Sequence, residues 1–416
     1  MSSLPSGLPQ STWGSQGARP LQPASRPPGL PRSAADGSAR IASIKALAAA
    51  QNLLAAADIH IQGSRPWDMQ VHHPDTLIRA LSRGSLGLGE AYMDGWWDCE
   101  RLDQFFHRIL GARIDERVGG APGAWQVLRA RLFNLQTARR AWQVGREHYD
   151  LGNDLFEGML DPTMAYSCGY WAQANDLDGA QQAKLDLVCR KLGLQSGMTL
   201  LDIGCGWGSL MRFAAEHYGV RCTGLTISRA QAAWGADKAR GLPVHFELAD
   251  YRSFNADGAR RFDRVASIGM FEHVGHKNYS AYFETAKRCL GEDGLFLLHT
   301  IGKNRSGLPM DAWTEKYIFN NGALPSAGEL SESCQRHFVI EDWHNFGADY
   351  DRTLMAWHER FERIWPQLKD RYGERFGRMW RYYLLSCAGT FRARSNQLWQ
   401  VVLSPAGRPA GYRRVS

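Results

Sequence analysis

The segment Leu200-Leu201-Asp202-Ile203-Gly204-Cys205-Gly206-Trp207-Gly208 joins an apolar strand to a turn built of alternating glycines. A buried strand that runs through a glycine turn into a helix is typical of the ligand-binding edge of an open α/β sheet. The spacing is G-x-G-x-G, whereas dinucleotide-binding folds carry G-x-G-x-x-G. Asp202 stands ahead of the first glycine and can hold a cationic amino-acid end. The segment therefore predicts a site for S-adenosylmethionine (SAM), and the alternative is a strand–helix turn without a ligand.

Strands and helices alternate along the chain around this segment, as they do in a parallel α/β sheet. A long stretch rich in Trp, Tyr, Phe and Arg, Leu354–Ala393, has helical periodicity and is expected to cover the carboxyl edge of the sheet. Apolar runs bounded by turn residues predict the strands, with helices falling between them. These strands are expected at Thr199–Ile203, Arg221–Leu225, Val244–Leu248, Phe262–Ser267, Gly294–Ile301, Phe338–Phe346 and Leu398–Leu403.

The N-terminal part of the chain divides into a tail, a small domain and a linker. Residues 1–40 are rich in Pro, Gly and Ser, so disorder is expected, and this Pro density opposes the amphipathic helix of a transit peptide. Residues 41–118 are predicted to form a small α+β domain, and residues 119–145 a linker with a basic helix. The remainder, 146–416, is the predicted catalytic domain, with a Rossmann-like α/β fold.

Local patterns predict the elements of the small domain. Ile41 begins a helical repeat, and Asp58–Gln62 and Trp67–Val71 alternate like half-buried strands. Thr76 follows a Pro-Asp pair that opens another helix, which Gly84 is expected to end.

The segment Trp125–Arg146 has the pattern of a basic amphipathic helix, with leucines on one face and arginines on the rest. Two interpretations remain open. In one, the helix lies on an anionic membrane surface. In the other, it packs on the catalytic domain and its arginines are solvated.

The composition restricts the class of protein. The 416 residues carry a formal net charge of +7, and no run of about 18 apolar residues predicts a membrane-spanning helix. The charge permits attraction to phospholipid headgroups or nucleic acid and proves neither. The 15 tryptophans favour interfaces, where one end of the ring is apolar and the other wet. The eight cysteines form no C-x-x-C pair and no zinc spacing, and no secretory signal is visible, so we expect a cytosolic protein with reduced thiols and no metal.

Three more positions extend the predicted cofactor pocket. The second strand leads into Thr226 and Gln231, which are polar but uncharged, whereas a typical SAM-binding fold carries an acidic residue there for the ribose hydroxyls. Asp250 follows the third strand and is placed to accept a hydrogen bond from an adenine amine. The alternative for Asp250 is an ordinary loop residue.

Several longer motifs carry a resemblance to a known family. Besides residues 200–208 and 89–97, they are Glu147–Asp154, Tyr166–Cys168, Gly269–Gly275, His299–Gly302, Glu341–Tyr350 and Cys387–Arg394. With these motifs the chain resembles the cyclopropane-fatty-acyl-phospholipid synthases from Gln62 onward. That family uses a Thr…Gln segment at the ribose, which agrees with Thr226 and Gln231.

The resemblance implies that the SAM methyl group is transferred to a cis double bond of a phospholipid acyl chain. Loss of a proton from the added carbon then closes a cyclopropane ring, with bound bicarbonate as the base. Cys387 matches a cysteine of suspected catalytic role. The bicarbonate pocket is matched by Cys168, Glu272, His299, Ile301 and Tyr350, and the cofactor site by Tyr166, Ser167, Gly204, Gly206, Thr226, Gln231 and Asp250 beside Asp202.

Elementary chemistry agrees with such a pocket. Deprotonation cannot activate an alkene, so the protein must align it with the methyl donor, exclude water and stabilise a carbocation with aromatic faces. No thiolate is needed, so we expect Cys168 to make a backbone contact and Cys387 to have a packing or positioning role. Glu272 beside an anion requires a proton on one of the two. The structural alternatives are a satisfied core histidine for His299 and a loop cap for Tyr350.

The expected partner is a phospholipid bilayer with unsaturated acyl chains, on which the small domain docks. The resemblance also implies a homodimer attached peripherally to the cytoplasmic membrane. A nucleic-acid partner is not expected, because the sequence has no basic groove pattern with interleaved aromatic residues. Two alternatives differ in function: a SAM enzyme that methylates lipid chains without ring closure, and a lipid-binding protein without catalysis.

Overall fold

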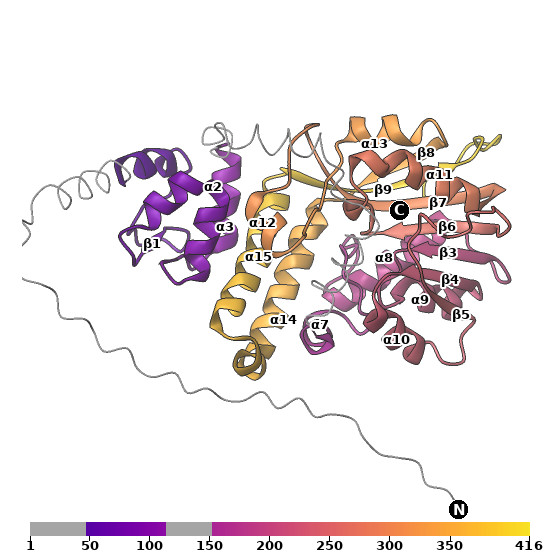
Figure 1. The fold of residues 1–416 in the computed structure, drawn as a ribbon, viewed down its shortest axis with the longest axis horizontal. Helices are drawn as coiled ribbons and strands as arrows, with labels where there is room; N and C mark the ends of the chain where they lie inside the picture. Colours follow the sequence, from indigo (N-terminus) through magenta and orange to yellow (C-terminus); the bar gives the residue numbers. More distant parts are fainter. Residues whose placement is uncertain (1–46, 114–151) are drawn as a thin grey trace, which may run out of the picture. The chain divides into compact units, whose positions relative to one another are not determined.

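A seven-stranded sheet forms the centre of the computed structural model, which describes residues 47–113 and 152–416 (Figure 1). The strand order is β5-β4-β3-β6-β7-β9-β8. Neighbours from β5 to β7 are parallel, and β9 runs antiparallel to both β7 and β8. The strands are β3 Thr199–Ile203, β4 Arg221–Thr226, β5 Val244–Leu248, β6 Phe262–Ile268, β7 Leu290–Lys303, β8 Val339–Asn345 and β9 Asn396–Ser404.

The predicted α/β class and all seven predicted strands are confirmed. Helices cover both faces of the sheet, so the side chains on both sides of a central strand are buried. Such strands therefore appear in the sequence as continuous apolar runs. Strand β7 extends beyond its predicted segment at both ends. The antiparallel direction of β9 was not predicted, since an apolar run carries no information about direction.

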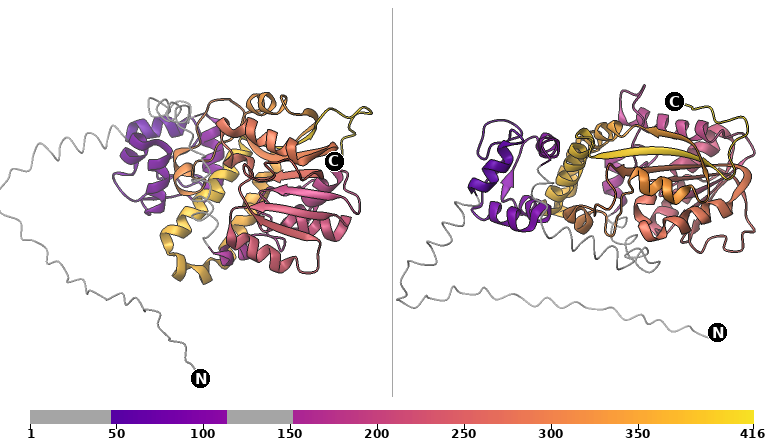
Figure 2. Two further views of the ribbon diagram at one scale, coloured as in Figure 1. Left: turned by 45° about the vertical axis from the view of Figure 1, so that its right-hand side comes forward. Right: turned by 90° about the horizontal axis from the view of Figure 1, so that it is seen from above.

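Each face of the sheet has its own core, because alternate residues of a strand point to opposite faces. On β3, Leu200 packs with α8 and α9, whereas Leu201 packs with α11. Figure 2 shows helices on both sides of the sheet. These helices are α8 Leu177–Lys191, α9 Ser209–Tyr218, α10 Arg229–Lys238, α11 Tyr279–Cys289 and α13 Ala327–Cys334, and the shorter helices are α7 Asn153–Met159, η1 Phe271–His273, η2 His276–Asn278 and α12 Ala312–Tyr317.

The predicted long helical stretch forms two helices, α14 Ala348–Tyr372 and α15 Glu374–Arg392, which pack against each other. Gly373 separates them with a φ of +79°, a conformation that glycine adopts at little cost. The pair buries a large aromatic core that includes Trp357 and Trp380. The sequence linked tryptophan to interfaces, but most tryptophans in the described part of the chain are buried inside it.

The described N-terminal residues are mostly helical. Residues 47–55 form a helix, and two short strands, β1 Gln70–Val71 and β2 Trp97–Asp98, pair antiparallel. Helix α2, Thr76–Met93, connects the two strands, and helix α3, Leu102–Gly111, follows β2. The predicted tail, the linker and the basic helix Trp125–Arg146 lie outside the described residues, as does most of the motif that begins at Glu147.

Two local predictions are wrong or incomplete in this region, and a third is confirmed. Asp58–Gln62 is a turn and loop, because the carboxylate of Asp68 accepts hydrogen bonds from the backbone N–H groups of His60 and Arg65 and closes it. Of the predicted strand Trp67–Val71, Gln70 and Val71 form β1, and Met69 makes an isolated bridge to Ile61. Gly84 interrupts the helix as predicted: its φ of +57° and ψ of −140° are not helical, and a second helical segment under the same label α2 continues to Met93.

The helices α2 and α3 pack on α15. Arg392 of α15 forms ion pairs with the buried Asp103 of α3 at 2.5 Å and with Asp351 of α14 at 2.8 Å. At Gly389 an added Cβ would lie 2.6 Å from the Cβ of Phe106 and 3.0 Å from the carbonyl oxygen of Asp103. The bare glycine therefore sets how closely α15 approaches α3. In the described ranges no helix is both long and apolar enough to cross a membrane.

We expect Gly389→Ala to destabilise the protein by about 1–3 kcal/mol, because overpacking against a neighbouring backbone outweighs the higher helix propensity of Ala. Gly111→Ala is the matched control, since Gly111 ends α3 with nothing within 4 Å of an added Cβ. Thermal unfolding of both variants measures the effect. A Gly389→Ala midpoint at or above that of Gly111→Ala would contradict the tight α3–α15 contact.

Candidate functional site

The glycine turn after β3 has the backbone conformation that the motif predicted. Gly204, Gly206 and Gly208 have φ values of +83°, +54° and +80°, which favour glycine over any other residue. An added Cβ at Gly206 would meet nothing within 4 Å, so it is the conformation and not crowding that requires glycine there. The turn leads directly into α9 and leaves open space at the carboxyl end of β3.

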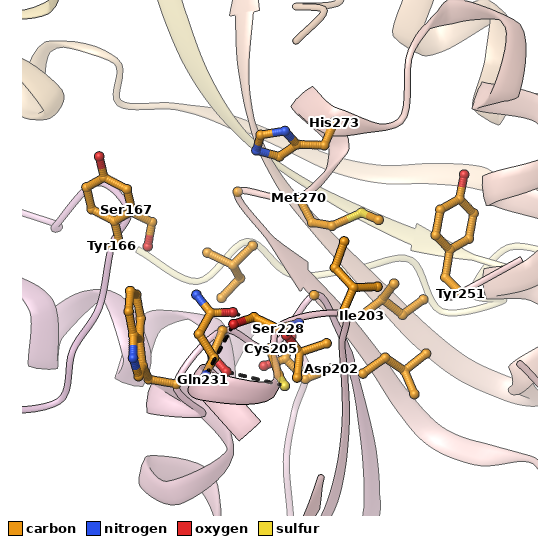
Figure 3. A pocket seen from close by; sticks show the side chains of 18 of the residues that line it. Tyr166, Ser167, Asp202, Ile203, Cys205, Ser228, Gln231, Tyr251, Met270 and His273 are labelled. Carbon is orange, nitrogen blue, oxygen red and sulfur yellow. Dashed lines mark hydrogen bonds between the residues drawn. The ribbon is translucent and has the colours of Figure 1, made fainter. Parts of the chain in front are cut away.

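A pocket opens beside this turn, and all eight predicted cofactor residues line it. Figure 3 shows Tyr166 and Ser167 on one side of the pocket and Tyr251 on the other. The predicted residues come from the segment before α8 and from the ends of three neighbouring strands. They are Tyr166, Ser167, Asp202, Gly204, Gly206, Thr226, Gln231 and Asp250.

Asp202 is buried at the end of β3 with an exposed fraction of 3%. Within the described residues its Oδ1 atom has no hydrogen-bond partner. Burial raises the pKa of this carboxyl to about 7, against the opposing charge of Lys184. A buried carboxylate without a partner is costly, so the pocket favours a cationic or hydrogen-bond-donating ligand at this point.

The end of β4 carries a hydrogen-bonded set of neutral polar groups. The hydroxyl of Thr226 donates to Oε1 of Gln231 at 3.2 Å and accepts from the backbone N–H of Ser228 at 3.1 Å. The backbone N–H of Gln231 donates to the hydroxyl of Ser228 at 3.3 Å, which caps α10. The prediction did not include Ser228, although a serine before a helix is a recognisable N-cap.

Asp250 lines the pocket, but its carboxylate is already engaged. The guanidinium of Arg252 donates from Nε to Oδ1 at 2.8 Å and from Nη2 to Oδ2 at 2.5 Å. A carboxylate offers about four lone-pair positions, so this pairing leaves capacity to accept from a ligand. The prediction did not include Arg252, which also lines the pocket.

Glu272 and Ile301 are joined directly, although 29 residues separate them. Oε1 of Glu272 accepts the backbone N–H of Ile301 at 2.7 Å, while Oε2 is buried without a partner in the described part of the chain. Burial raises the pKa of Glu272 to about 7, and the Ile301 N–H opposes that rise. At neutral pH this carboxyl is therefore present in both protonation states.

His299 lies on β7 two residues before Ile301 and is almost fully buried. The side-chain amide nitrogen of Gln400 lies 3.2 Å from Nδ1. With the amide nitrogen of Gln400 on this side, Nδ1 accepts and the ring proton is assigned to Nε2, which has no partner among the described residues. Burial holds the pKa of His299 well below its usual range, so the ring is neutral.

The remaining predicted residues are a tyrosine and two neutral thiols. Tyr350 stacks on Phe391 with ring centroids 4.5 Å apart. The Cys168 thiol donates to the carbonyl oxygen of Gly169 at 3.2 Å, and burial raises its pKa well above the usual value. Burial also raises the pKa of Cys387 to about 12, so neither cysteine is a thiolate at neutral pH.

None of the six predicted catalytic residues lines the cofactor pocket, but the structure gathers them beside it. Burial raises the pKa of Tyr350 well above its usual value, and Cys168, Glu272 and Cys387 are among the ionisable groups near it. The hydroxyl of Tyr166, a pocket residue, lies 2.8 Å from that of Tyr383, which the prediction did not include. Buried aromatic rings therefore connect the two groups of residues, since Trp357 contacts both Tyr166 and Tyr350.

Lys184 and His273 also line the pocket and were not predicted as site residues. Lys184 of α8 has a pKa lowered by burial to about 8. His273 lies in the motif Gly269–Gly275, and burial lowers its pKa to about 4. The sequence could have indicated Lys184, because it is a charged residue at a position that helical spacing assigns to the core. Across residues 47–113 and 152–416, no group of three or more His, Cys, Asp or Glu side chains could hold a metal ion.

Comparisons with known proteins agree on one family. The family model described as mycolic acid cyclopropane synthetase matches residues 136–401. The cyclopropane-fatty-acyl-phospholipid synthase of Escherichia coli (strain K12) is 54% identical over 356 residues, which cover 85% of this chain and 92% of that protein. A probable fatty acid methyltransferase of Pseudomonas putida is 39% identical over 266 residues, 61% of this chain and 67% of that protein.

A solved structure shares the fold. It is that of mycolic acid cyclopropane synthase CmaA1 complexed with SAH and CTAB, with a TM-score of 0.59 and 35% sequence identity. The match covers 63% of this chain and 97% of that one. Nearly all of the solved chain is therefore matched, whereas a substantial part of this chain lies outside the match.

We expect Glu272→Gln to gain stability relative to the wild type as the pH rises from about 4.5 to 7. Burial raises the pKa of Glu272 from 4.5 to about 7, so in this window the unfolded chain ionises first and the folded wild type is penalised. The difference should reach about 3 kcal/mol above pH 7. Urea unfolding between pH 5 and 8 measures it, with Glu292→Gln at an exposed position of β7 as the control. A difference that does not change with pH would mean that Glu272 is ordinarily ionised in the folded protein.

Proposed function

The chain belongs to the mycolic acid cyclopropane synthetase family of SAM-dependent methyltransferases, and we propose that it forms cyclopropane rings on the unsaturated acyl chains of membrane phospholipids. The observation that carries this proposal is the juxtaposition of two sites. The pocket at the glycine turn suits a nucleoside with a cationic end, and the buried polar set around Glu272 and His299 lies beside it. A cis double bond has to meet both for methyl transfer and proton removal.

The residues of the pocket fit SAM. The partnerless Oδ1 atom of Asp202 suits its ammonium group, and the bare Gly206 leaves room for a ligand against the backbone. Thr226 and Gln231 offer neutral hydrogen-bonding groups for the ribose, and Asp250 offers acceptor capacity for the adenine amine. When bound there, SAM supplies a methyl group on a positively charged sulfur, the electrophile that an alkene needs.

The aromatic side chains between the two sites would protect and stabilise the reacting acyl chain. Tyr166, Tyr350 and Tyr383 gather there, and Trp357 contacts the rings of both Tyr166 and Tyr350. Ring faces attract cations, so they would stabilise the carbocation that methyl addition leaves on the acyl chain. Their burial also excludes water, which would otherwise capture that cation as an alcohol.

The polar set also fits a small oxyanion. Nε2–H of neutral His299 is a donor without a partner in the described residues. Oε2 of Glu272 also has no hydrogen-bond partner there. With a pKa of about 7, a protonated Glu272 can donate a hydrogen bond instead of repelling an anion. Bicarbonate held there would supply a base for the proton of the added carbon. The neutral Cys168 and Cys387 would shape the pocket without reacting.

Membrane attachment and assembly complete the proposal. Unsaturated phospholipids occur in bilayers, so the enzyme must reach a bilayer from its surface, and we assign that contact to residues 41–118 and to peripheral binding at the cytoplasmic membrane. The positive net charge supports attraction to anionic headgroups. We keep the homodimer as part of the same proposal.

We expect the purified protein to convert cis-unsaturated acyl chains into cyclopropane chains when it is incubated with SAM and vesicles. The vesicles contain phosphatidylethanolamine and phosphatidylglycerol with cis-octadecenoyl chains, and NMR of the extracted fatty acids detects the ring protons. Vesicles with saturated chains are the control and should give no product. A methyl-branched or methylene-branched product would favour the alternative of methylation without ring closure. Unchanged lipid would contradict both functions.

In the same assay, we expect Glu272→Gln to lower kcat by about 100-fold or more, because proton removal loses the group that holds the base. Its affinity for S-adenosylhomocysteine (SAH) should stay within about twofold of the wild type, since Glu272 does not line the cofactor pocket. Glu292→Gln serves as the control with unchanged turnover. Equal losses in turnover and in SAH binding would remove Glu272 from the catalytic set.

A further inference from the structure

Helix α8 holds one wall of the cofactor pocket through two buried polar side chains. The side-chain amide of Gln181 donates to the carbonyl oxygens of Ser167 at 2.8 Å and Ala165 at 3.3 Å. One turn later, Nζ of Lys184 donates to the hydroxyl of Ser167 at 2.8 Å. Gln181 and Lys184 have exposed fractions of 0% and 1%. They fix the segment that carries Tyr166 and Ser167 against the helix.

Lys184 is left with unused hydrogen-bonding capacity. An ammonium group has three donors, and in the described part of the chain Ser167 is the acceptor within hydrogen-bond distance of Nζ. Burial lowers the pKa of Lys184, and the charges of the neighbouring Asp161 and Asp202 oppose that lowering. A buried ammonium whose charge is not matched by contact is costly. Both Lys184 and Asp202 line the same pocket.

A second buried lysine on the same helix, Lys191, differs from Lys184 in the partners of its ammonium group. Lys191 has an exposed fraction of 0%, and its Nζ lies 2.9 Å from Nδ1 of His344 and 3.9 Å from Oδ2 of Asp342. It does not line the pocket. The protein itself therefore provides Lys191 with a carboxylate, whereas Lys184 lines the cavity and its Nζ contacts the hydroxyl of Ser167, another lining residue.

We propose that Lys184 binds the α-carboxylate of the methionine part of SAM, while Asp202 takes the α-ammonium group. The inference rests on the proposed function, because it assigns a ligand group to a residue of the same pocket. A zwitterion placed between a buried cation and a buried anion satisfies both without adding net charge. Ser167, whose hydroxyl already contacts Nζ, lies on the carboxylate side.

This assignment makes Lys184 a residue of cofactor specificity. Thr226, Gln231 and Asp250 hold the nucleoside end, and Lys184 with Asp202 holds the opposite end. With both ends anchored, the sulfur between them has little freedom, which favours alignment of its methyl group with a double bond. Ligands that lack the carboxylate should bind weakly because they lose the contact with the side chain of Lys184.

The test compares two ligands that differ only in that carboxylate, SAH and its decarboxylated analogue S-adenosyl-3-thiopropylamine. Isothermal titration calorimetry at pH 7 gives the Kd of each for wild type, Lys184→Met and Lys191→Met. We expect the wild type to prefer SAH by about 10- to 100-fold, the range for a hydrogen bond between charged groups. Lys184→Met should lower that preference to within about threefold, while Lys191→Met keeps it. A general loss of structure would weaken both ligands alike and leave the ratio unchanged.

Each outcome decides the matter. An unchanged ratio in Lys184→Met would overturn the role of Lys184 and leave the proposed function standing. Failure of the wild type to bind SAH would overturn the proposed function and the inference together. If Lys184→Met does not fold, Lys184→Gln replaces it, since glutamine can still donate to Ser167 without the charge. A wild type that binds both ligands equally well overturns the inference whatever the variants do.

Discussion

Desolvation of ionisable side chains at the carboxyl edge of the sheet is the constraint on which the site depends. It raises the pKa values of Asp202 and Glu272 to about 7 and lowers that of Lys184 to about 8. Burying a charge costs free energy unless a partner compensates it. The protein leaves Oδ1 of Asp202 and Oε2 of Glu272 without one in the described residues. That cost is what prepares the site for a charged ligand and for proton transfer near neutral pH.

The helices α14 and α15 make this desolvation achievable. Their aromatic residues form a core that continues into the walls of the site, where Tyr350 stacks on Phe391 of α15 and Tyr383 contacts Tyr166. The tryptophans that composition associated with interfaces are used instead to fill this interior. Large rigid rings bury much area at low conformational cost, so they suit a chamber that must stay closed to water and still admit an acyl chain.

Sequence prediction succeeded where the signal is local and failed where a distant contact decides. The apolar strands and the positive φ angles of the glycine turn follow from residue type within a short window. The supposed strand at Asp58–Gln62 failed because Asp68, outside that window, folds the segment into a loop. Gly84 interrupts the helix as its residue type predicts, but only the structure shows that a second helical segment continues from there to Met93.

The sequence by itself determined the α/β fold, the cofactor edge and, through contiguous motifs, the family. Only the tertiary structure decided what each site residue can do chemically. It joined Glu272 to the backbone of Ile301, placed the side-chain amide of Gln400 beside Nδ1 of His299, and brought Lys184 into the pocket beside Ser167. The physical reason is that protonation and hydrogen bonding depend on the distance to water and to partners, and those partners lie many residues away along the chain.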